Sequence, residues 1–390
     1  MAKHKISEDR SATWTINGDS QAWTLQQQAT ITVNGTAAID VLDTSVGNTL
    51  KILGDIVASG DGGLGIDVNG VNTRILLGKL AEIDADRGID ATANGLKVIN
   101  RGDIDGQVYG IGNSGSSTIK NFGDISGDTG ISTLGTSQVI NGEGAKILGD
   151  FAGVILSTGS NAVLINDGLI AGNDFAVRML TGGENKLTNT GTIHGDVLFG
   201  IGDDLFDTRK GIVDGVVTGG NGDDVFMIGK NDITIIEDND GGQDKVIAAK
   251  SHELGENIEA LRLTGKTNAS GFGNDEDNFI VGNKGNNTLA GGEGDDVIGG
   301  GLGDDVLQGG DDADTFVFNF GDDHDQIVDF VDGEDTIQLN GFDGIDSFAD
   351  LATKMFKNGS DVWIQLGNGD RLIIDSADVG DFDASDFQFN

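Results

Sequence analysis

The sequence predicts an all-β protein: a right-handed parallel β-solenoid with longer rungs first and shorter acidic rungs after them, closed by a C-terminal β-rich cap. Two internal repeats with different periods support this fold class. The composition supports it too, because 65 glycines and no proline occur among 390 residues. Without proline, every backbone N–H stays available to the hydrogen-bond ladders of stacked strands.

The longer repeat covers residues 31–198 and has rungs of about 20–25 residues. The segments "LKVINRGDIDGQVYGIGN" and "STIKNFGDISGDTGISTLG" show its recurring phrase of aliphatic residues between Asn and Gly corners. One rung cannot bury its aliphatic row, but stacked rungs bury a continuous one. Residues 1–30 are predicted to cap this solenoid, with Trp14 and Trp23 covering the first rung rather than binding sugar.

Asparagines recur at the corners of these rungs. We expect them to cap turns or to form side-chain ladders rather than to bind a ligand. They are Asn34, Asn69, Asn94, Asn100, Asn121, Asn141, Asn166 and Asn189.

The shorter repeat is nine residues long and fills residues 273–317 with five consecutive copies: "GNDEDNFIV", "GNKGNNTLA", "GGEGDDVIG", "GGLGDDVLQ" and "GGDDADTFV". Two more copies, "FGIGDDLFD" at 199–207 and "GGNGDDVFM" at 219–227, lie in a transitional segment, residues 199–272. Within 273–317, eleven carboxylates face one basic residue, Lys284. Because like charges at this density repel, the segment needs a cation to fold.

Each nonapeptide is expected to form a turn from its first six residues and a short strand from its last three, so that two copies make one coil. Large residues of these strands should enter the core. The residues assigned to that role are Phe279, Val297, Val306 and Phe316.

The pattern G-G-x-G-x-D-x-U-x, where U is a large apolar residue, resembles the RTX family (repeats in toxin, hemolysin-type calcium-binding repeat). The resemblance implies several Ca²⁺ ions that bridge successive turns, held by the sixth-position side chain and by backbone carbonyls. The candidate metal ligands and turn residues are Asp204, Asp224, Asn278, Asn287, Gly291, Gly292, Gly294, Asp296, Gly300, Gly301, Gly303, Asp305, Gly309 and Asp314.

Three copies depart from the pattern. Asn278 and Asn287 are neutral at the sixth position, so their sites should be weaker or empty. Glu276 and Asp312 replace the glycine at position four, and the turn that contains Asp312 is expected to close the row of ions. Without Ca²⁺ the acidic segment should be largely unstructured, and with Ca²⁺ it should order.

Residues 318–390 resemble the C-terminal region of RTX proteins exported by type I secretion. Phrases such as "EDTIQL" and "DVWIQL" alternate as half-buried strands do, and "SFADLATKMF" has helical spacing. The last 15 residues, 376–390, are acidic and aromatic, as an uncleaved export signal of this family would be. The N-terminus shows no apolar stretch typical of a secretory signal peptide.

Charge and composition exclude several classes of partner. With 24 Lys and Arg against 64 Asp and Glu, the net charge is −40, which disfavours nucleic acid and anionic membranes. The sequence contains no run of 18 apolar residues, so it predicts no transmembrane helix. The absence of cysteine rules out thiolate metal sites.

The sequence predicts no catalytic site and no cofactor other than Ca²⁺. No H-E-x-x-H or G-x-S-x-G motif occurs. The alternative is a polysaccharide lyase or epimerase on the solenoid, but its candidate groups are expected to be scattered. They are Tyr109, His194, Arg74, Arg87, Arg101 and Arg178.

We therefore predict a secreted, calcium-binding structural or adhesive protein of the cell surface or extracellular matrix, of the surface-layer, biofilm-matrix or adhesin-like kind. Its expected partners are Ca²⁺, the type I secretion machinery, further copies of itself in a homo-oligomer, lattice or filament, and a surface or matrix polysaccharide.

Overall fold

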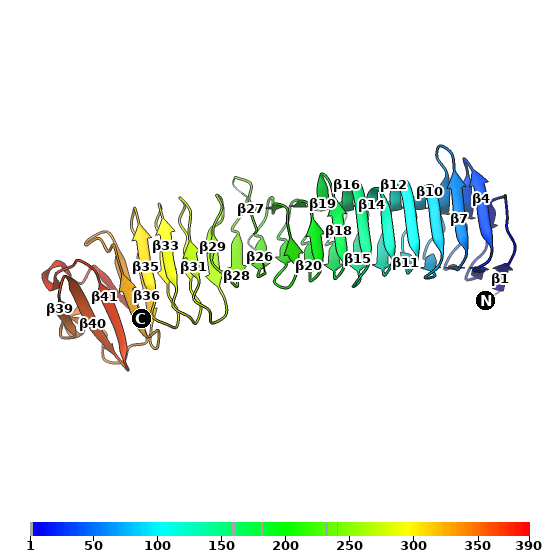
Figure 1. The fold of residues 1–390 in the computed structure, drawn as a ribbon. Coiled ribbons are helices and arrows are strands. Elements are labelled where there is room, and N and C mark those ends of the chain that lie inside the picture. The colour runs from blue at the N-terminus through cyan, green and yellow to red at the C-terminus, as the bar shows by residue number, and fades with distance from the viewer. Residues whose placement is uncertain (1–2, 158–160, 181, 231–232, 240) are drawn as a thin grey trace. The chain divides into compact units, whose positions relative to one another are not determined.

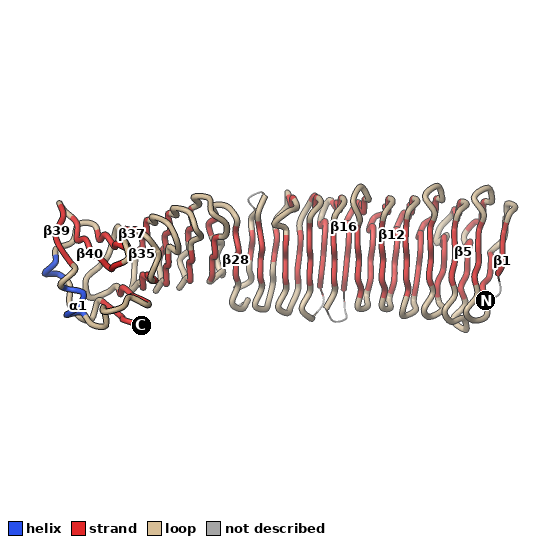
Figure 2. Tube along the Cα trace, turned by 90° about the horizontal axis from the view of Figure 1, so that it is seen from below, coloured by secondary structure: helices blue, strands red, loops and turns tan. Residues whose placement is uncertain are grey.

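The computed structural model describes residues 3–157, 161–180, 182–230, 233–239 and 241–390, and the chain forms two compact units, Met1–Gly222 and Asp223–Asn390. Nearly all regular structure is β (Figure 1), and the strands of each unit follow one another as stacked coils (Figure 2). The parallel pairing confirms the predicted right-handed β-solenoid. No helix in the described ranges is long and apolar enough to cross a membrane.

Each coil of the first unit contributes one strand to a first parallel face. In order of pairing, the strands are β1 (Lys3–Ile6), β3 (Ala22–Leu25), β6 (Thr49–Ile52), β9 (Arg74–Leu77), β11 (Leu96–Asn100), β13 (Ser117–Asn121), β15 (Ser137–Asn141), β17 (Val163–Asn166), β20 (Lys186–Asn189) and β23 (Leu205–Asp207).

A second face continues each coil. Its strands are β4 (Thr30–Asn34), β7 (Asp55–Ser59), the first parts of β10 (Glu82–Ala91), β12 (Asp103–Asn113), β14 (Asp124–Thr133) and β16 (Lys146–Ser157), then β18 (Leu169–Gly172), β21 (Thr192–His194) and β24 (Ile212–Val213).

A third face completes the coil. Its strands are β2 (Trp14–Ile16), β5 (Ala37–Val41), β8 (Leu64–Val68), the second parts of β10, β12, β14 and β16, then β19 (Phe175–Leu180), β22 (Val197–Phe199) and β25 (Val217–Thr218).

The long strands bend where the second face meets the third. In β12 the register shifts between Asp105 and Tyr109. A side chain at Gly106 would lie less than 3 Å from the carbonyl oxygen of Tyr109, so only glycine fits at this bend. The bend gives the first unit three faces around one core.

Stacked aliphatic side chains fill the core of the first unit. Ile104, Ile125 and Ile147 occupy equivalent positions in β12, β14 and β16 and are almost fully buried. Burial of each such side chain contributes about 1.5–3 kcal/mol. Trp14 and Trp23 are also buried, with an edge-to-face contact at 5.3 Å between ring centroids, as expected for residues that cover a rung.

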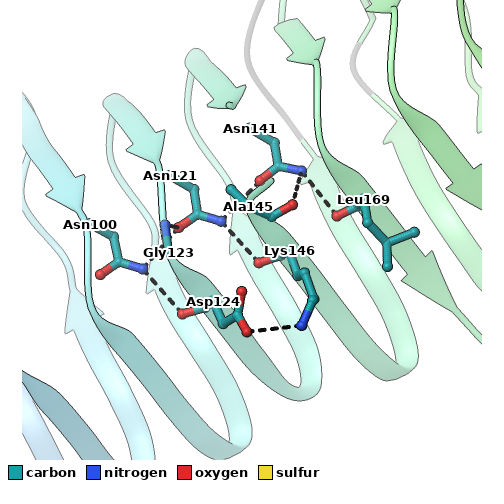
Figure 3. A network of polar contacts seen from close by, with 8 residues as sticks. All are labelled: Asn100, Asn121, Gly123, Asp124, Asn141, Ala145, Lys146 and Leu169. Atoms are coloured by element: carbon teal, nitrogen blue, oxygen red, sulfur yellow. Dashed lines mark hydrogen bonds and ion pairs between the residues drawn. The ribbon is translucent and has the colours of Figure 1, made fainter. Parts of the chain in front are cut away.

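The corner asparagines form a buried side-chain ladder (Figure 3). The Nδ2 group of Asn100 donates to Oδ1 of Asn121 at 2.8 Å, and Asn121 donates in the same way to Asn141 at 2.9 Å. The ladder continues through Asn166 and Asn189 to the hydroxyl of Thr208, at 2.8 to 3.0 Å. Each Nδ2 group also donates to a backbone carbonyl of the following coil, such as that of Lys146.

The ladder confirms the structural role expected for five of the corner asparagines, whereas the role of Asn34 stays a prediction. Asn69 and Asn94 lie outside it, but they also support turns: Asn69 bonds to Asp67 and Thr92, and Asn94 accepts from the backbone of Ser116.

The coils of the second unit have two faces. On one, parallel strands pair in the order β26 (Val225–Ile228), β28 (Lys245–Ala248), β30 (Ala260–Leu263), β32 (Phe279–Val281), β34 (Val297–Gly299), β36 (Thr315–Asn319), β38 (Thr336–Asn340) and β42 (Phe387–Phe389). The other contains β29 (His252–Glu253), β31 (Ser270–Phe272), β33 (Thr288–Gly292), β35 (Val306–Gly310) and β37 (His324–Ile327). The short strand β27 (Ile235–Ile236) lies between β26 and β28 in the chain.

Pairs such as Phe279 with Val297 and Thr288 with Val306 are 18 residues apart, which confirms two nonapeptides per coil. The prediction of which residues of these strands enter the core was mostly wrong. Phe316 is buried, but Phe279 is 51% exposed and Val297 and Val306 are only half-buried.

Because successive side chains of a strand alternate between faces, the residue at position eight of each copy is the one that points inward. These inward residues are Ile280, Leu289, Ile298, Leu307 and Phe316.

The C-terminal residues close the second unit. The strand β41 (Asp370–Ile374) pairs in parallel with β37, β40 (Asp361–Gly367) pairs antiparallel with β41, and β39 (Met355–Asn358) pairs antiparallel with β40. The short helix α1 (Phe348–Ala352), capped by Ser347, lies within the segment with helical spacing, and a 3₁₀ turn covers Val379–Asp381. This arrangement leaves fewer open strand edges at the end of the solenoid.

Candidate metal-binding site

The sixth residue of each nonapeptide lies directly before a strand of the second unit. Asn278, Asp296 and Asp314 precede β32, β34 and β36 at one corner of the coil, and Asn287 and Asp305 precede β33 and β35 at the other. The structure therefore brings the predicted residues together as two rows, one at each corner.

Hydrogen bonds connect the members of each row. Oδ1 of Asp296 accepts from the backbone N–H of Asn278 at 2.7 Å, and Oδ1 of Asp314 accepts from that of Asp296 at 3.0 Å. At the other corner, Oδ1 of Asp305 accepts from the backbone N–H of Asn287 at 2.6 Å. Each carboxylate thus binds the coil before it, which fixes its position.

The second carboxylate oxygen of each aspartate is buried without a hydrogen-bond partner. Oδ2 of Asp296, Asp305 and Asp314 has no partner among the described residues, and each side chain is about 1% exposed. Burial of an unpaired charge is costly. These three oxygens are therefore positioned for a cation.

Burial also raises the pKa of these carboxyl groups. The pKa is about 7 for Asp296 and Asp314 and about 6 for Asp305, because desolvation outweighs the hydrogen bonds that the carboxylates accept. Neighbouring carboxylates, such as Asp295 beside Asp296, raise the pKa further. A cation would remove both penalties.

The glycines of each turn make room for this arrangement. A side chain on Gly291, Gly300 or Gly309 would lie less than 3 Å from Oδ2 of the aspartate in the same copy. Position one must therefore be glycine because the sixth side chain folds back over it.

Four further glycines have backbone conformations that other residues rarely adopt. Gly292 and Gly301 have φ values of 137° and 88°, and Gly294 and Gly303 have values of 99° and 118°. These residues place the turns of successive coils in close backbone contact: a side chain on Gly301 would lie 2.6 Å from the carbonyl oxygen of Asn283.

The asparagines at the sixth position are already hydrogen-bonded within the protein. Oδ1 of Asn278 accepts from the backbone of Asn274 at 2.8 Å, and its Nδ2 group donates to Ile258. Asn287 bonds in the same way to Asn283 and Ala269. With both ends of each amide engaged, these turns have less capacity for a cation.

The two upstream candidates occupy equivalent positions. In the first unit, Oδ1 of Asp204 accepts from the backbone of Asn185 at 2.6 Å, and burial raises the pKa of Asp204 to about 6. In the second unit, Asp224 is 1% exposed and its backbone N–H donates to Oδ1 of Asp244 at 2.8 Å.

That the turn with Asp312 closes the row of ions stays a prediction, but the row of buried carboxylates does not end at this turn. Asp312 adopts φ of 75°, so the turn keeps its shape without glycine. The backbone N–H of Asp305 donates to Asp325 and that of Asp314 donates to Asp335, both at 3.0 Å. Burial raises the pKa of Asp325 to about 9. The rows of carboxylates therefore continue past residue 317.

Asp325 and Asp335 were not predicted from the sequence, although the sequence contains a signal for them. Each lies two positions before a buried apolar residue, Ile327 or Ile337, as the sixth position of a nonapeptide does. The glycines that mark the turn are absent there, and extra residues interrupt the nine-residue spacing.

The donor set defines a class of protein: a parallel β-solenoid whose corners present carboxylate and carbonyl oxygens to a hard divalent cation. Ca²⁺ prefers six to eight such oxygens in a tolerant geometry. The buried, unpartnered Oδ2 atoms fit this requirement.

Comparison with known families identifies the repeat. The model of the RTX calcium-binding nonapeptide repeat matches residues 272–307 and 300–325, in four copies. These residues are therefore RTX repeats, and the resemblance to the RTX family is confirmed. Repeats of this kind bind Ca²⁺ and are typical of extracellular proteins exported by type I secretion.

A search of curated proteins gave no match. Among solved structures, the chain is similar to the extracellular lipase LipA from Serratia marcescens, with 15% sequence identity and a TM-score of 0.28. The similarity covers 70% of this chain and 40% of the lipase, so the chain spans less than half of that protein. Similarity at this level carries no inference about activity.

Proposed function

We propose that this chain is a secreted structural or adhesive protein of the cell surface or extracellular matrix, exported unfolded by the type I secretion machinery and folded outside the cell by Ca²⁺. Dissociation constants of about 10⁻⁴ to 10⁻³ M are usual for extracellular calcium modules. Such sites are empty in the cytosol and filled outside. The unpaired carboxylates would thus keep the acidic coils from residue 273 onward unfolded during export.

The ladders of buried polar side chains carry this proposal. In the first unit, Asn100, Asn121 and Asn141 bond to the next coil and present no polar group to a ligand. In the second unit, the buried carboxylates bond from coil to coil in the same way. Both units thus use their buried polar groups to build a scaffold.

The residues that would hold the cations have defined roles. Asp296, Asp305 and Asp314 supply Oδ2, while Oδ1 fixes each carboxylate to the preceding coil. Gly291, Gly300 and Gly309 leave the space into which that oxygen folds. Bound Ca²⁺ supplies the positive charge that balances these carboxylates.

One observation favours the alternative function, a polysaccharide lyase or epimerase. The expectation that its candidate groups are scattered was wrong for two of them, because Arg87 and Tyr109 are paired neighbours in β10 and β12. The Arg87 guanidinium lies 5.7 Å from the centroid of the Tyr109 ring and 3.4 Å from the carboxylate of Asp90. His194, in contrast, lies four coils further on and pairs with Asp214.

The electrostatics of this group oppose such an activity. Burial and the neighbouring carboxylate of Asp90 raise the pKa of Tyr109 far above its ordinary value. A catalytic base needs a pKa lowered toward neutrality, so the raised pKa disfavours Tyr109 as a base. Asp67 and Asp90, stacked side by side, would also repel an anionic uronate.

Arg101 and Arg178 do not complete a site with Tyr109. Arg101 lies over the ring of Phe122 and Arg178 over that of Phe175, at 5.7 and 4.7 Å from the ring centroids. Stacking on aromatic rings accounts for their positions. We therefore favour the scaffold over the enzyme.

Light scattering and negative-stain electron microscopy of the full chain test the scaffold role. Addition of Ca²⁺ should produce a lattice, a filament or another homo-oligomer, and EGTA should disperse it. A particle that stays monomeric through the titration, and that binds neither cells nor surface polysaccharide, contradicts the proposal.

An enzyme assay tests the alternative. The Ca²⁺-loaded protein is incubated with alginate or pectin, and unsaturated or epimerised uronates are measured. We expect none. Product that forms with the wild type and disappears in Tyr109→Phe would establish the enzyme instead.

A further inference from the structure

Three buried carboxylates converge at the start of the second unit, outside the residues that match the RTX repeat. Asp224 precedes β26, Glu237 follows β27 and Asp244 precedes β28. One carboxylate oxygen of each lies within 4.8 Å of those of the other two, and the side chains are 1%, 4% and 1% exposed. Three parts of the chain thus place acidic groups around one point.

The hydrogen bonding of Asp244 is the observation that points to a bound cation at this cluster. Its Oδ1 atom accepts from the backbone N–H of Asp224 at 2.8 Å, whereas its Oδ2 atom is buried and has no hydrogen-bond partner among the described residues. No ion pair joins Asp244 to a basic residue of the described ranges. Its own backbone N–H donates to the carboxylate of Glu259 at 2.6 Å, which adds a further negative charge nearby.

Buried carboxylates at this separation repel one another unless a cation lies between them. All the side-chain donors are oxygens, which select a hard cation. Ligands on opposite sides of one Ca²⁺ are about 4.6–5.2 Å apart, since each Ca–O distance is about 2.3–2.6 Å. The limit of 4.8 Å is therefore compatible with a single shared ion.

We propose that Asp224, Glu237 and Asp244 together bind one Ca²⁺, with Glu237 and Asp244 as ligands that lie outside any nonapeptide. The site takes one ligand from a repeat, Asp224, and completes it with two carboxylates from the following coil. It joins the chain segments of β26, β27 and β28. The site does not depend on a structural or adhesive role for the protein.

Two isosteric variants of the full chain, Glu237→Gln and Asp244→Asn, test the site. Asp238→Asn is the matched control, because Asp238 is adjacent to Glu237 but exposed. Ca²⁺ bound per chain is measured by equilibrium dialysis and isothermal titration calorimetry, with Mg²⁺ titrated in parallel.

We expect each variant to bind one Ca²⁺ fewer than the wild type, or to bind that ion at least about tenfold more weakly, while Asp238→Asn is unchanged. Unchanged stoichiometry and affinity in both variants would overturn the proposal, as would tighter binding of Mg²⁺ than of Ca²⁺ at this site.

Thermal unfolding distinguishes a cation site from a hydrogen-bonded cluster. In EGTA the variants should melt at or above the wild-type temperature, because a repulsive buried charge has been removed, and in Ca²⁺ they should melt below it. A lower melting temperature in EGTA, equal to the loss in Ca²⁺, would show that the carboxylates only support the fold.

Discussion

The double substitution Asp296→Asn with Asp305→Asn should weaken the Ca²⁺-induced folding of the second unit. Each change keeps an Oδ1 acceptor for the backbone N–H of Asn278 or Asn287, so the row of hydrogen bonds is preserved. Each also replaces the buried, unpartnered Oδ2 by an amide group that cannot bind a cation. The substitutions therefore report on cation binding rather than on packing.

The loss of stability that this double substitution should cause follows from the linkage between Ca²⁺ binding and folding. At a Ca²⁺ concentration 100 times its dissociation constant, one ion that binds only the folded chain contributes about 2.7 kcal/mol. Loss of two ions removes about 5 kcal/mol. For a unit of this size, 1 kcal/mol corresponds to about 2–4 °C, so the melting temperature in Ca²⁺ should fall by about 10–20 °C.

Circular dichroism against Ca²⁺ concentration is the assay, and Asn278→Ala with Asn287→Ala is the comparison. The aspartate pair should move the Ca²⁺ midpoint to higher concentration by more than the asparagine pair, whose amides bond only within the protein. Equal midpoints for the two double variants would refute the ranking of the sites.

Three further predictions concern pH, the asparagine ladder and the glycine turns. Because burial raises the pKa of the sixth-position aspartates from 3.8 to about 6–7, folding without Ca²⁺ is favoured at low pH and loses that contribution as pH rises through 6–7. A Ca²⁺-free sample should therefore be more structured at pH 5 than at pH 7.5 by circular dichroism; the reverse order would contradict this. Asn141→Ala should destabilise the first unit by about 2–4 kcal/mol in urea, with or without Ca²⁺, because it leaves buried polar groups unpaired; the exposed Gln138→Ala should not, and equal effects would count against the ladder. Gly300→Ala should lower Ca²⁺ affinity at least tenfold by calorimetry because the new side chain displaces Oδ2 of Asp305, whereas Gly299→Ala, with its nearest contact at 3.5 Å, should leave affinity unchanged.

The nine-residue period predicted the coil length and the positions of Asp296, Asp305 and Asp314, because a fixed spacing places equivalent residues at the same corner. The period failed for Asp325 and Asp335, which lie 20 and 21 residues after their partners rather than 18. Extra residues in a loop hide such a position from a search for regular spacing.

The contact between Arg87 and Tyr109 could have been found from the sequence. The two residues are 22 positions apart, which is one rung of the first solenoid. The convergence of Glu237 with Asp244 could not, because it depends on how the irregular segment around β27 folds, and no repeat marks that segment.

Hydrogen exchange resolved by peptide, with and without Ca²⁺, tests most directly the claim that Ca²⁺ orders the acidic coils. In EGTA, amides of residues 273–340 should exchange at rates near those of an unfolded chain, while the buried strands of residues 96–189 stay protected by a Ca²⁺-independent core. Addition of Ca²⁺ should slow exchange in 273–340 by orders of magnitude. Equal protection of both regions in EGTA would contradict the account.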